Sequence, residues 1–180
     1  AIGYIKKTMS GDVMNIKKVS VDKEGTGMGW GAVYAQYLES MDQIGEQGNG
    51  LSVSRQLYKG DEALNESAPL KVGDRITVRL TVKADRDMDF VQIKDDRAAC
   101  MEPLQAVSGF RWGNGLGYYQ ATKDASTQFF IDQMRKGTYV IEYQVYVNRT
   151  GEYQAGIATV QSAYAPEFGG HTGGYRVMVE

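Results

Sequence analysis

The stretch RITVRLTVKA, residues 75–84, decides the fold class of this chain. Its apolar side chains fall on every second residue from Ile76 to Ala84, and polar or charged ones fill the positions between them. Ten residues of strict alternation predict a β-strand with one face buried and the other in water. Phe90, Val91 and Ile93 follow a charged break, so we expect a second strand there, paired with the first as an antiparallel hairpin.

Alternation returns at residues 138–148, where a second long strand is expected. A glycine-containing loop at 149–151 closes it, so a returning strand over 153–163 would make a second hairpin. Elsewhere we expect strands at 51–58 and 175–179, a strand-like aromatic segment at 30–37, a bulged or imprecise strand at 14–21, and loops at 45–50 and 59–69. Many short strands without helical patterns predict an all-β fold, an antiparallel β-sandwich.

The length and composition agree with one soluble β-rich domain, or with such a domain and an appendage. The chain has 180 residues, with 22 glycines and 12 tyrosines, a balance that favours all-β folds. A net charge of −2 argues against nucleic acid as a partner, and no apolar run approaches the roughly 20 residues that cross a bilayer. The chain starts Ala-Ile-Gly, without an initiator Met or a leader pattern, so either a signal has been removed or, as we favour, the chain is a piece of a larger protein.

Three aspartates, Asp85, Asp87 and Asp89, have the spacing of a calcium-binding loop, and Asp96 stands at its twelfth position. That loop needs glycine at position six, where this chain has Phe90. We therefore expect a charged hairpin tip here and no metal site.

The sequence also lacks a recognisable pattern of catalytic residues. His171 is the single histidine, within a glycine-rich segment, and we expect it in a solvated loop because no Gly-x-Ser-x-Gly motif accompanies it. A glycosidase needs two carboxylates across a cleft, and the candidate acidic residues are expected on the surface: Asp95, Asp96, Glu102, Asp124 and Asp132. We predict no enzyme activity and no cofactor.

Cys100 is the single cysteine and cannot form an internal disulfide. It opens Cys-Met-Glu-Pro, which differs from the Cys-x-Glu-Gln motif of an internal thioester by one residue. Pro103 stands where that motif has glutamine, and proline has no side-chain carbonyl for the thiol to join. We expect Cys100 to be a small, partly buried side chain at a strand end.

An aromatic group, Phe110, Trp112, Tyr118 and Tyr119, surrounds the glycines of residues 113–117. Two interpretations stay open. These rings plug the end of the sandwich or form a contact surface for a neighbouring domain, or they form a platform on which sugars stack. The second interpretation requires Trp112, Tyr118 and Tyr119 to be coplanar and exposed along a groove.

Several phrases, taken in order, resemble the C-terminal macroglobulin-like domain of bacterial alpha-2-macroglobulin family proteins, particularly the large Bacteroidetes-type members. The matching phrases cover nearly the whole chain: GYIKK, WGAVYAQYLESMDQI, LKVGDRITVRLTVKADRDMDFVQIKD, the stretch from SGFRW to FFID, KGTYVIEYQVYVNRTGEY and GIATVQSAYAPEF. No phrase is a catalytic signature, and the specificity lies in the length and order of the match.

The resemblance implies a single macroglobulin-like or immunoglobulin-like sandwich over residues 1–180, with 1–13 as a linker or an edge strand. Its parent would be a very large secreted or periplasmic endopeptidase inhibitor, often a lipoprotein, which traps proteases after cleavage of a bait region. The domain itself would be non-catalytic. It would pack against other domains of the parent, including a thioester domain where one is present, and would meet target proteases only through the parent.

In related bacterial members a Met-Tyr-x-Pro stretch of the last domain shields the thioester. The matching positions here are 163–166, where Tyr164 and Pro166 agree and Ala163 departs. The resemblance therefore implies an interdomain contact whose candidate residues are Tyr164, Pro166, Phe110, Trp112, Tyr118 and Tyr119. The alternative function is a carbohydrate- or cell-surface-binding sandwich module.

Overall fold

The computed structural model describes residues 3–11, 15–65 and 68–180, and the chain divides into two compact units, Ala1–Leu38 and Glu39–Glu180. The first unit has no β-strand among its described residues, and their side chains are exposed. The strand expected at 30–37 is therefore wrong, as is the strand expected at 14–21 over its described part, 15–21; Met14 lies outside the described residues. Trp30 and Tyr34 remain 91% and 86% exposed, so apolar content here does not lead to burial.

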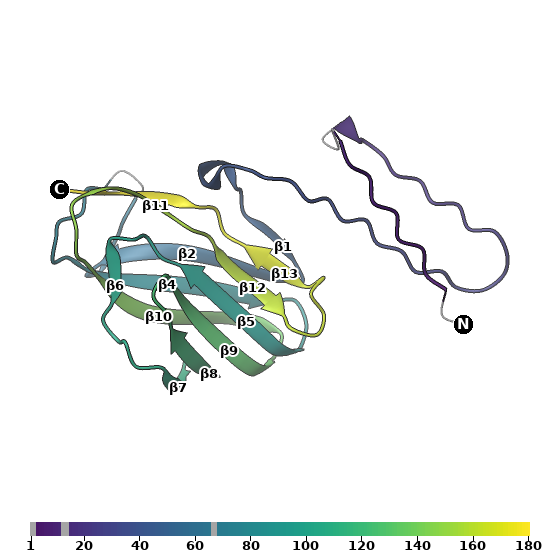
Figure 1. Cartoon of the computed structure of the whole chain (residues 1–180). Coiled ribbons are helices and arrows are strands. Elements are labelled where there is room, and N and C mark those ends of the chain that lie inside the picture. Colours follow the sequence, from purple (N-terminus) through teal and green to yellow (C-terminus); the bar gives the residue numbers. More distant parts are fainter. Residues whose placement is uncertain (1–2, 12–14, 66–67) are drawn as a thin grey trace. The chain divides into compact units, whose positions relative to one another are not determined.

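The second unit is almost entirely β-structure (Figure 1). It begins with a short 3₁₀-helix, η2 (Met41–Gln43). The strands that follow are β1 (Gln47–Asn49), β2 (Leu51–Lys59), β3 (Glu62–Ala63), β4 (Arg75–Ala84), β5 (Met88–Asp96), β6 (Met101–Pro103), β7 (Gly109–Gly113), β8 (Leu116–Thr122), β9 (Ser126–Met134), β10 (Gly137–Val147), β11 (Gly151–Ala155), β12 (Ala158–Ser162), β13 (Gly169–His171) and β14 (Tyr175–Val179).

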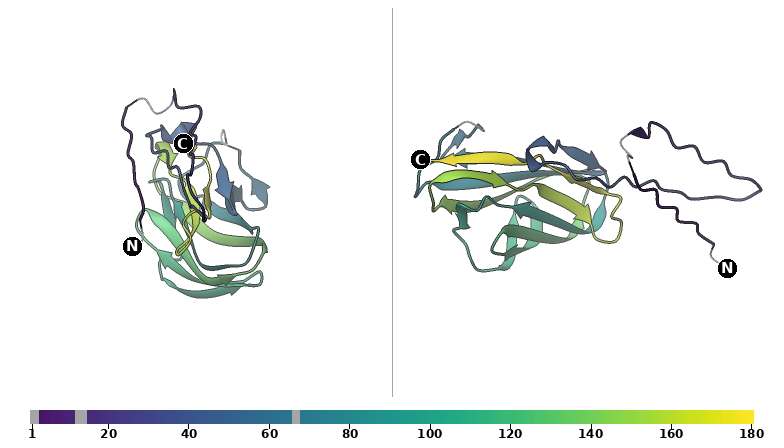
Figure 2. Two further views of the ribbon diagram at one scale, coloured as in Figure 1. Left: turned by 90° about the vertical axis from the view of Figure 1, so that its right-hand side faces the viewer. Right: turned by 45° about the horizontal axis from the view of Figure 1, so that its top comes forward.

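One continuous sheet curls over on itself to make the sandwich. Its strand order is β6-β10-β4-β2-β1-β13-β12-β5-β9-β8-β7, with β3 beside β2, and β11 pairs with β14 separately. Figure 1 shows β5, β9 and β8 crossing in front of β4 and β10, and the left view of Figure 2 looks at the curled sheet from one end. The predicted antiparallel β-sandwich is confirmed.

The alternating stretch behaves as predicted. β4 runs from Arg75 to Ala84, and its apolar side chains are buried to 2% exposure or less. They belong to one core cluster with buried side chains of β10 and β5, and Phe129 of β9 lies 5.9 Å from Tyr143 of β10, ring centre to ring centre, across the two layers. Burial at roughly 25 cal/mol per Å² of apolar surface is what holds such a sandwich together.

Both predicted hairpins are wrong. β4 pairs with β2 and β10, whereas β5 pairs with β9 and β12, so the chain crosses from one layer to the other between them. Likewise β11 pairs with β14 and not with β10. Two consecutive strands that each have one apolar face can bury those faces against each other only from opposite layers, whereas a hairpin would leave both on one side.

Smaller corrections concern the loops. The expected loop at 45–50 contains β1, and the expected loop at 59–69 contains β3 in its described part. The expected strand at 153–163 is two strands, interrupted near Gly156, where a Cβ atom would lie 2.5 Å from Cβ of Asp96. The strands that join the two layers, β1 and β13, are similarly close to β2: a Cβ on Gly170 would lie 2.7 Å from the carbonyl oxygens of Gln47 and Leu51.

Candidate interdomain contact surfaces

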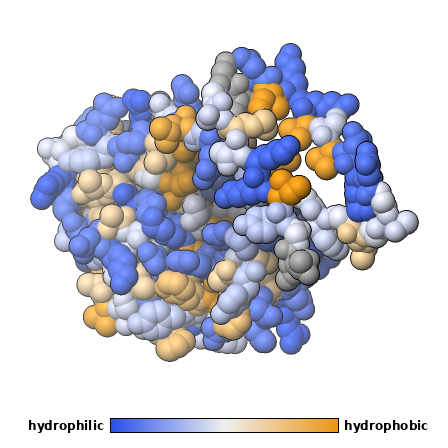
Figure 3. Space-filling view, turned by 45° about the vertical axis from the view of Figure 1, so that its right-hand side comes forward, coloured by the Kyte–Doolittle hydropathy of each residue, from blue (hydrophilic) through white to orange (hydrophobic). Residues whose placement is uncertain are grey.

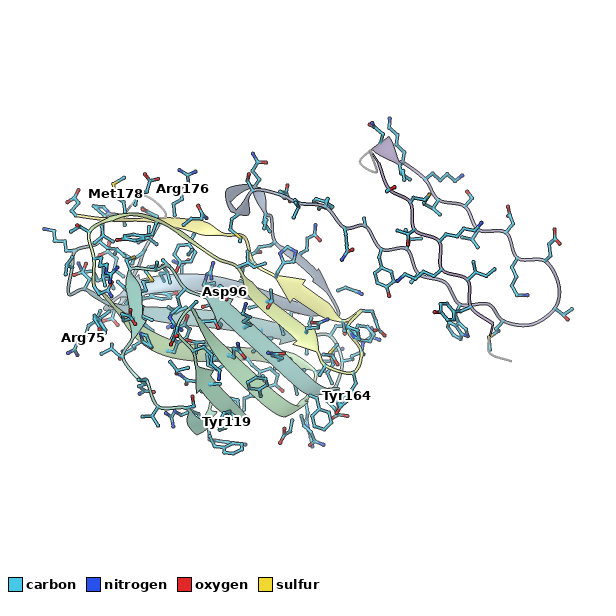
Figure 4. The ribbon with its side chains drawn as sticks, viewed as in Figure 1. Arg75, Asp96, Tyr119, Tyr164, Arg176 and Met178 are labelled. Atoms are coloured by element: carbon cyan, nitrogen blue, oxygen red, sulfur yellow. The ribbon has the colours of Figure 1, made fainter. Side chains whose placement is uncertain are left out.

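Tyr164 lies in the connection between β12 and β13, which we call the Tyr164 loop (residues 163–168). Its side chain is 81% exposed. Figure 4 places Tyr164 at one end of the sandwich and Arg75 at the other. A large ring with a single hydroxyl at the end of a sheet suits a contact that is apolar in the centre and polar at its margin.

Backbone hydrogen bonds fix the Tyr164 loop. The Phe168 amide donates to the Ala165 carbonyl at 2.9 Å, and the Ser162 amide donates to the Phe168 carbonyl at 3.0 Å. The Ala163 amide donates to the Phe90 carbonyl of β5 at 2.8 Å. The loop is therefore attached both to itself and to the neighbouring strand, and Tyr164 stands on a defined backbone.

Phe90 packs against Tyr164 edge to face. The ring centres are 5.1 Å apart and the planes meet at 84°. The backbone of Phe90 is left-handed, with φ of 53°, and its side chain is 49% exposed. The alternation of the sequence breaks at 85–89, but nothing in that pattern marks Phe90 as a contact residue, so sequence reasoning missed it.

Pro166 lines a groove of about 600 Å³ beside the Tyr164 loop. The floor of the groove is β1, β12 and β13, and the lining residues are Gln47, Gly48, Asn49, Thr159, Val160, Gln161, Pro166, Gly169, Gly170 and His171. His171 lies in a strand and not in the expected solvated loop, and its Nδ1 is 3.1 Å from the Thr172 carbonyl oxygen. The groove lining includes no carboxylate, serine or cysteine that could act with His171.

A second exposed aromatic surface lies on β7 and β8. Phe110 and Trp112 are each 79% exposed, and Phe110 packs edge to face on Tyr119 at 5.1 Å. Trp112 lies over Gly117, where a Cβ atom would come within 2.9 Å of the indole. A groove of about 430 Å³ runs along this surface. We call the surface formed by Phe110, Trp112 and Tyr119 the β7–β8 face.

Tyr118 does not belong to the β7–β8 face. It points the other way, toward the core, with its ring 5.6 Å from that of Phe129. Phe110 and Tyr119 meet at 75°, so they are not coplanar either. The structure therefore places Phe110, Trp112 and Tyr119 on one face of the hairpin and Tyr118 on the other, and the coplanar set that sugar stacking requires is absent there.

Apolar groups on the side of the molecule shown in Figure 3 are small and separated by hydrophilic residues. No helix in the described part of the chain is long and apolar enough to cross a membrane. Within residues 3–11, 15–65 and 68–180, no group of three or more histidine, cysteine or acidic residues could hold a metal ion.

The aspartates that have the spacing of a calcium loop bind separate partners in the structure. Asp85 pairs with Arg86 at 2.9 Å, and Asp87 accepts from the Lys136 amide at 2.7 Å. Asp96 lies at the far end of β5, paired with Lys94. Cys100 is fully buried, and burial raises the pKa of its thiol, which makes it unreactive.

Asp95 corrects the expectation of a surface carboxylate, because it is 1% exposed. It forms a buried ion pair with Arg55 of β2, and the Tyr143 hydroxyl donates to it at 2.7 Å. Burial raises the pKa of Asp95, and Arg55 and Tyr143 oppose that rise by favouring the carboxylate. A charged pair inside the sandwich joins β2 and β5 across the two layers.

Arg55 also holds the base of the hairpin that carries the Tyr164 loop. Its Nη2 donates to the carbonyl of Gly156, just before β12, at 2.7 Å, and to the carbonyl of Gly173, just after β13, at 3.2 Å. Its guanidinium lies 4.3 Å from the ring centre of Tyr175. The sequence offered no signal for this arrangement, because an arginine on a polar strand position is usually solvated.

These features define an antiparallel β-sandwich domain with two exposed aromatic surfaces. The bacterial alpha-2-macroglobulin MG10 domain family matches residues 50–167, and the chain belongs to that family. The predicted resemblance to a macroglobulin-like domain is confirmed, whereas the Bacteroidetes-type subgroup stays a prediction.

Solved structures agree in fold. A tyrosine-to-glycine mutant of Salmonella alpha-2-macroglobulin matches with a TM-score of 0.65 and 19% identity, over 76% of this chain and 10% of that one. Native Escherichia coli alpha-2-macroglobulin from domain MG7 to the C-terminus matches with a TM-score of 0.63 and 17% identity, over 75% of this chain and 24% of that one.

A curated relative, circularly permutated Ras protein 2 of Dictyostelium discoideum, is 27% identical over 166 residues. That match covers 88% of this chain and 4% of the relative. The chain therefore spans a small part of every relative named here.

Proposed function

We propose that this chain is the non-catalytic terminal domain of an alpha-2-macroglobulin-like endopeptidase inhibitor. It packs against neighbouring domains of its parent through the Tyr164 loop and stabilises the resting state, and the parent meets the target proteases. In this proposal the parent lies at the cell envelope or outside the cell, which family membership supports, and a lipid anchor is one form of attachment.

One observation carries the proposal: a tyrosine 81% exposed on a loop whose backbone is fixed. A mobile loop could expose such a ring by chance, whereas this ring is exposed on a backbone that hydrogen bonds hold in place. Rigid aromatic anchors are typical of contact centres, because little conformational entropy is lost when a partner covers them. Pro166 and the adjacent groove extend the same surface.

The experiment compares Tyr164→Ala with wild type in the intact parent protein. Amide hydrogen exchange over 163–168 is measured in the parent and in this chain alone, and the ratio gives the protection that docking adds. We expect the variant to lose roughly thirtyfold or more of that protection, the effect of a residue at the centre of a contact. The matched control is Tyr146→Ala, an exposed tyrosine of β10 at 40% exposure.

A parent in which Tyr164→Ala and Tyr146→Ala leave the protection ratio equally unchanged would remove the proposal. Native-gel mobility of the parent without protease gives a second readout, since a weakened resting state shifts spontaneously to the altered form. Loss of protection without any shift in mobility would separate docking from control of the resting state.

Sugar binding stays a second candidate because of Trp112 alone. Its indole lies over Gly117 and remains 79% exposed, which leaves one ring face open to a pyranose. The chain has two tryptophans, Trp30 and Trp112, so fluorescence titration with neutral oligosaccharides is simple to assign with Trp112→Ala. A saturable change that disappears in this variant supports the candidate; an unchanged spectrum at millimolar sugar removes it.

A further inference from the structure

Phe90 has a backbone conformation that its side chain does not favour. Phe90 and Asn114 are the non-glycine residues with positive φ in the described part of the chain, at 53° and 51°. Asparagine tolerates this region, whereas a bulky aromatic residue there is an outlier. Such strain persists where the surroundings impose it, and it gathers at functional sites.

The fold needs this conformation but not the ring. Met88 and Val91 are both buried, at 7% and 1% exposure, although three positions apart they would lie on opposite faces of a regular strand. The left-handed residue lies between them, where the inward-facing side of β5 changes. Glycine or asparagine would adopt this conformation at lower cost, and the Phe90 ring adds little to the core because it is 49% exposed.

The ring contacts Tyr164. The 5.1 Å edge-to-face pair and the 2.8 Å bond from the Ala163 amide to the Phe90 carbonyl attach both the backbone and the side chain of the Tyr164 loop to this one residue. We infer that Phe90 is a positioning residue, which orients the Tyr164 ring before the neighbouring domain of the parent docks. This inference rests on the proposed function of the Tyr164 loop.

The physical benefit is preorganisation. A side chain already held in its bound rotamer does not lose that freedom on association, so the contact is tighter without any added contact to the partner. An aromatic pair of this geometry favours the held rotamer by a factor of roughly two to ten. Phe90 then acts on the partner through Tyr164 and not by touching it.

The first part of the test uses the free chain. Phe90→Asn keeps a residue that accepts positive φ and removes the ring, and Phe90→Tyr keeps the ring. Proton NMR of Tyr164 reads the pair directly, because an adjacent ring displaces the resonances of its neighbour. We expect that displacement to disappear in Phe90→Asn and to remain in Phe90→Tyr, with the melting temperature of Phe90→Asn equal to or above wild type. If Phe90→Asn does not fold, Phe90→Gly replaces it.

The second part uses the intact parent and the protection ratio of 163–168 described above. We expect Phe90→Asn to lower the ratio roughly twofold to tenfold, Phe90→Tyr to preserve it, and Phe90→Asn to have no further effect in the Tyr164→Ala background. An unchanged ratio in Phe90→Asn, with a loss in Tyr164→Ala, overturns the positioning role and leaves the docking proposal intact. Additive losses also overturn it, because they show that Phe90 contacts the partner itself. No loss in either variant removes the docking proposal.

Discussion

Two hairpins of this domain expose aromatic rings, and they hold those rings by different means. The β12–β13 hairpin is anchored at its base by the Arg55 guanidinium and at its tip by backbone hydrogen bonds, and its exposed ring stands on a loop. The β7–β8 hairpin ends the sheet, and its exposed rings belong to strand residues, with the Trp112 indole over Gly117. The same 5.1 Å edge-to-face pair occurs in each.

The two hairpins differ in how much unfavourable free energy accompanies their aromatic pairs. On the β7–β8 face, Phe110 and Tyr119 sit on ordinary strand backbone, so their pair simply adds to stability. At the Tyr164 loop, the pair is accompanied by the strained backbone of Phe90 and a buried charge. A strained backbone and a buried ion pair both cost free energy, and that cost suits a surface that must keep one shape for a partner. The β7–β8 face has neither feature and suits an adaptable contact.

The largest effect is expected from Arg55→Met. The change leaves Asp95 buried without its cation, which typically costs about 3–5 kcal/mol in the free energy of unfolding. Hydrogen exchange should rise first in β12 and β13, whose ends Arg55 holds, and later in β7 and β8. Chemical denaturation gives the magnitude.

Arg79→Met serves as the control, because Arg79 pairs with Glu142 on the surface. We expect its unfolding midpoint to stay close to wild type. Equal loss in the two variants, or uniform exchange in both hairpins of Arg55→Met, would contradict a specific anchor at the base of β12–β13.

Alkaline pH should weaken the buried polar group beneath the β12–β13 hairpin, where Tyr143 bonds Asp95 and Tyr175 lies against Arg55. Burial raises the pKa of Tyr143 well above its ordinary value, with the Asp95 charge adding to the rise, and burial also raises the pKa of Tyr175. Because the folded pKa exceeds the unfolded one, this stability is complete below about pH 10 and is lost as pH rises above it, by about 1.4 kcal/mol per pH unit for each phenol.

Urea denaturation between pH 8 and 11.5, followed with tyrosinate absorbance, measures the loss. Tyr143→Phe removes the buried hydroxyl and should flatten the decline above pH 10. A decline of the same slope in Tyr143→Phe would show that other groups cause the alkaline transition.

A smaller effect is expected from Gly117→Ala. The new Cβ would lie 2.9 Å from the Trp112 indole, so the ring must move, at a cost of about 1–3 kcal/mol if the neighbours resist. The emission of Trp112 should shift while exchange in the Tyr164 loop stays as in wild type. Gly113→Ala is the neighbouring control, since nothing lies within 4 Å of its Cβ position; matching spectra in the two variants would mean that Trp112 does not depend on Gly117.

The smallest effect comes from the two Phe–Tyr pairs. Phe110→Ala should lower stability by about 0.5–1.5 kcal/mol, the worth of the aromatic pair. Phe90→Asn loses an equivalent pair but relieves a strained backbone, so its net change should be near zero or stabilising. Thermal unfolding of both variants checks the contrast, and a larger loss in Phe90→Asn than in Phe110→Ala would refute it.

The β-sandwich followed from the strands predicted at 75–84 and 138–148, which the structure has as β4 and β10, because period-two alternation over ten residues has one physical explanation. The pairing of those strands did not follow. Alternation says which face is buried but not which strand lies alongside, so crossing from layer to layer could not be distinguished from a hairpin. Trp30 and Tyr34 show the converse error, since aromatic residues alone predicted a strand that has no sheet partner among the described residues.

Some of the candidate contact residues could be found from the sequence, and others could not. Tyr164 came from a resemblance, and its exposure agrees with that role. Tyr118 could not be separated from Tyr119 without the register of β8, because neighbouring strand residues point to opposite faces. Phe90 and Arg55 were missed because a backbone dihedral and a partner 40 residues away leave no local pattern.

The glycines of β1 and β13, the strands that join the two layers, can mislead a mutational scan. Gly48 and Gly170 have no room for a methyl group, because backbone carbonyl oxygens lie 2.7 Å from where it would be. Both line the groove beside Pro166. A mutational scan would find that neither position tolerates substitution and would suggest a binding hotspot next to Tyr164. The cause would instead be that the strands lie too close together to admit a side chain. Only double variants with Tyr164 can tell a recognition epitope from a tight crossing of the chain.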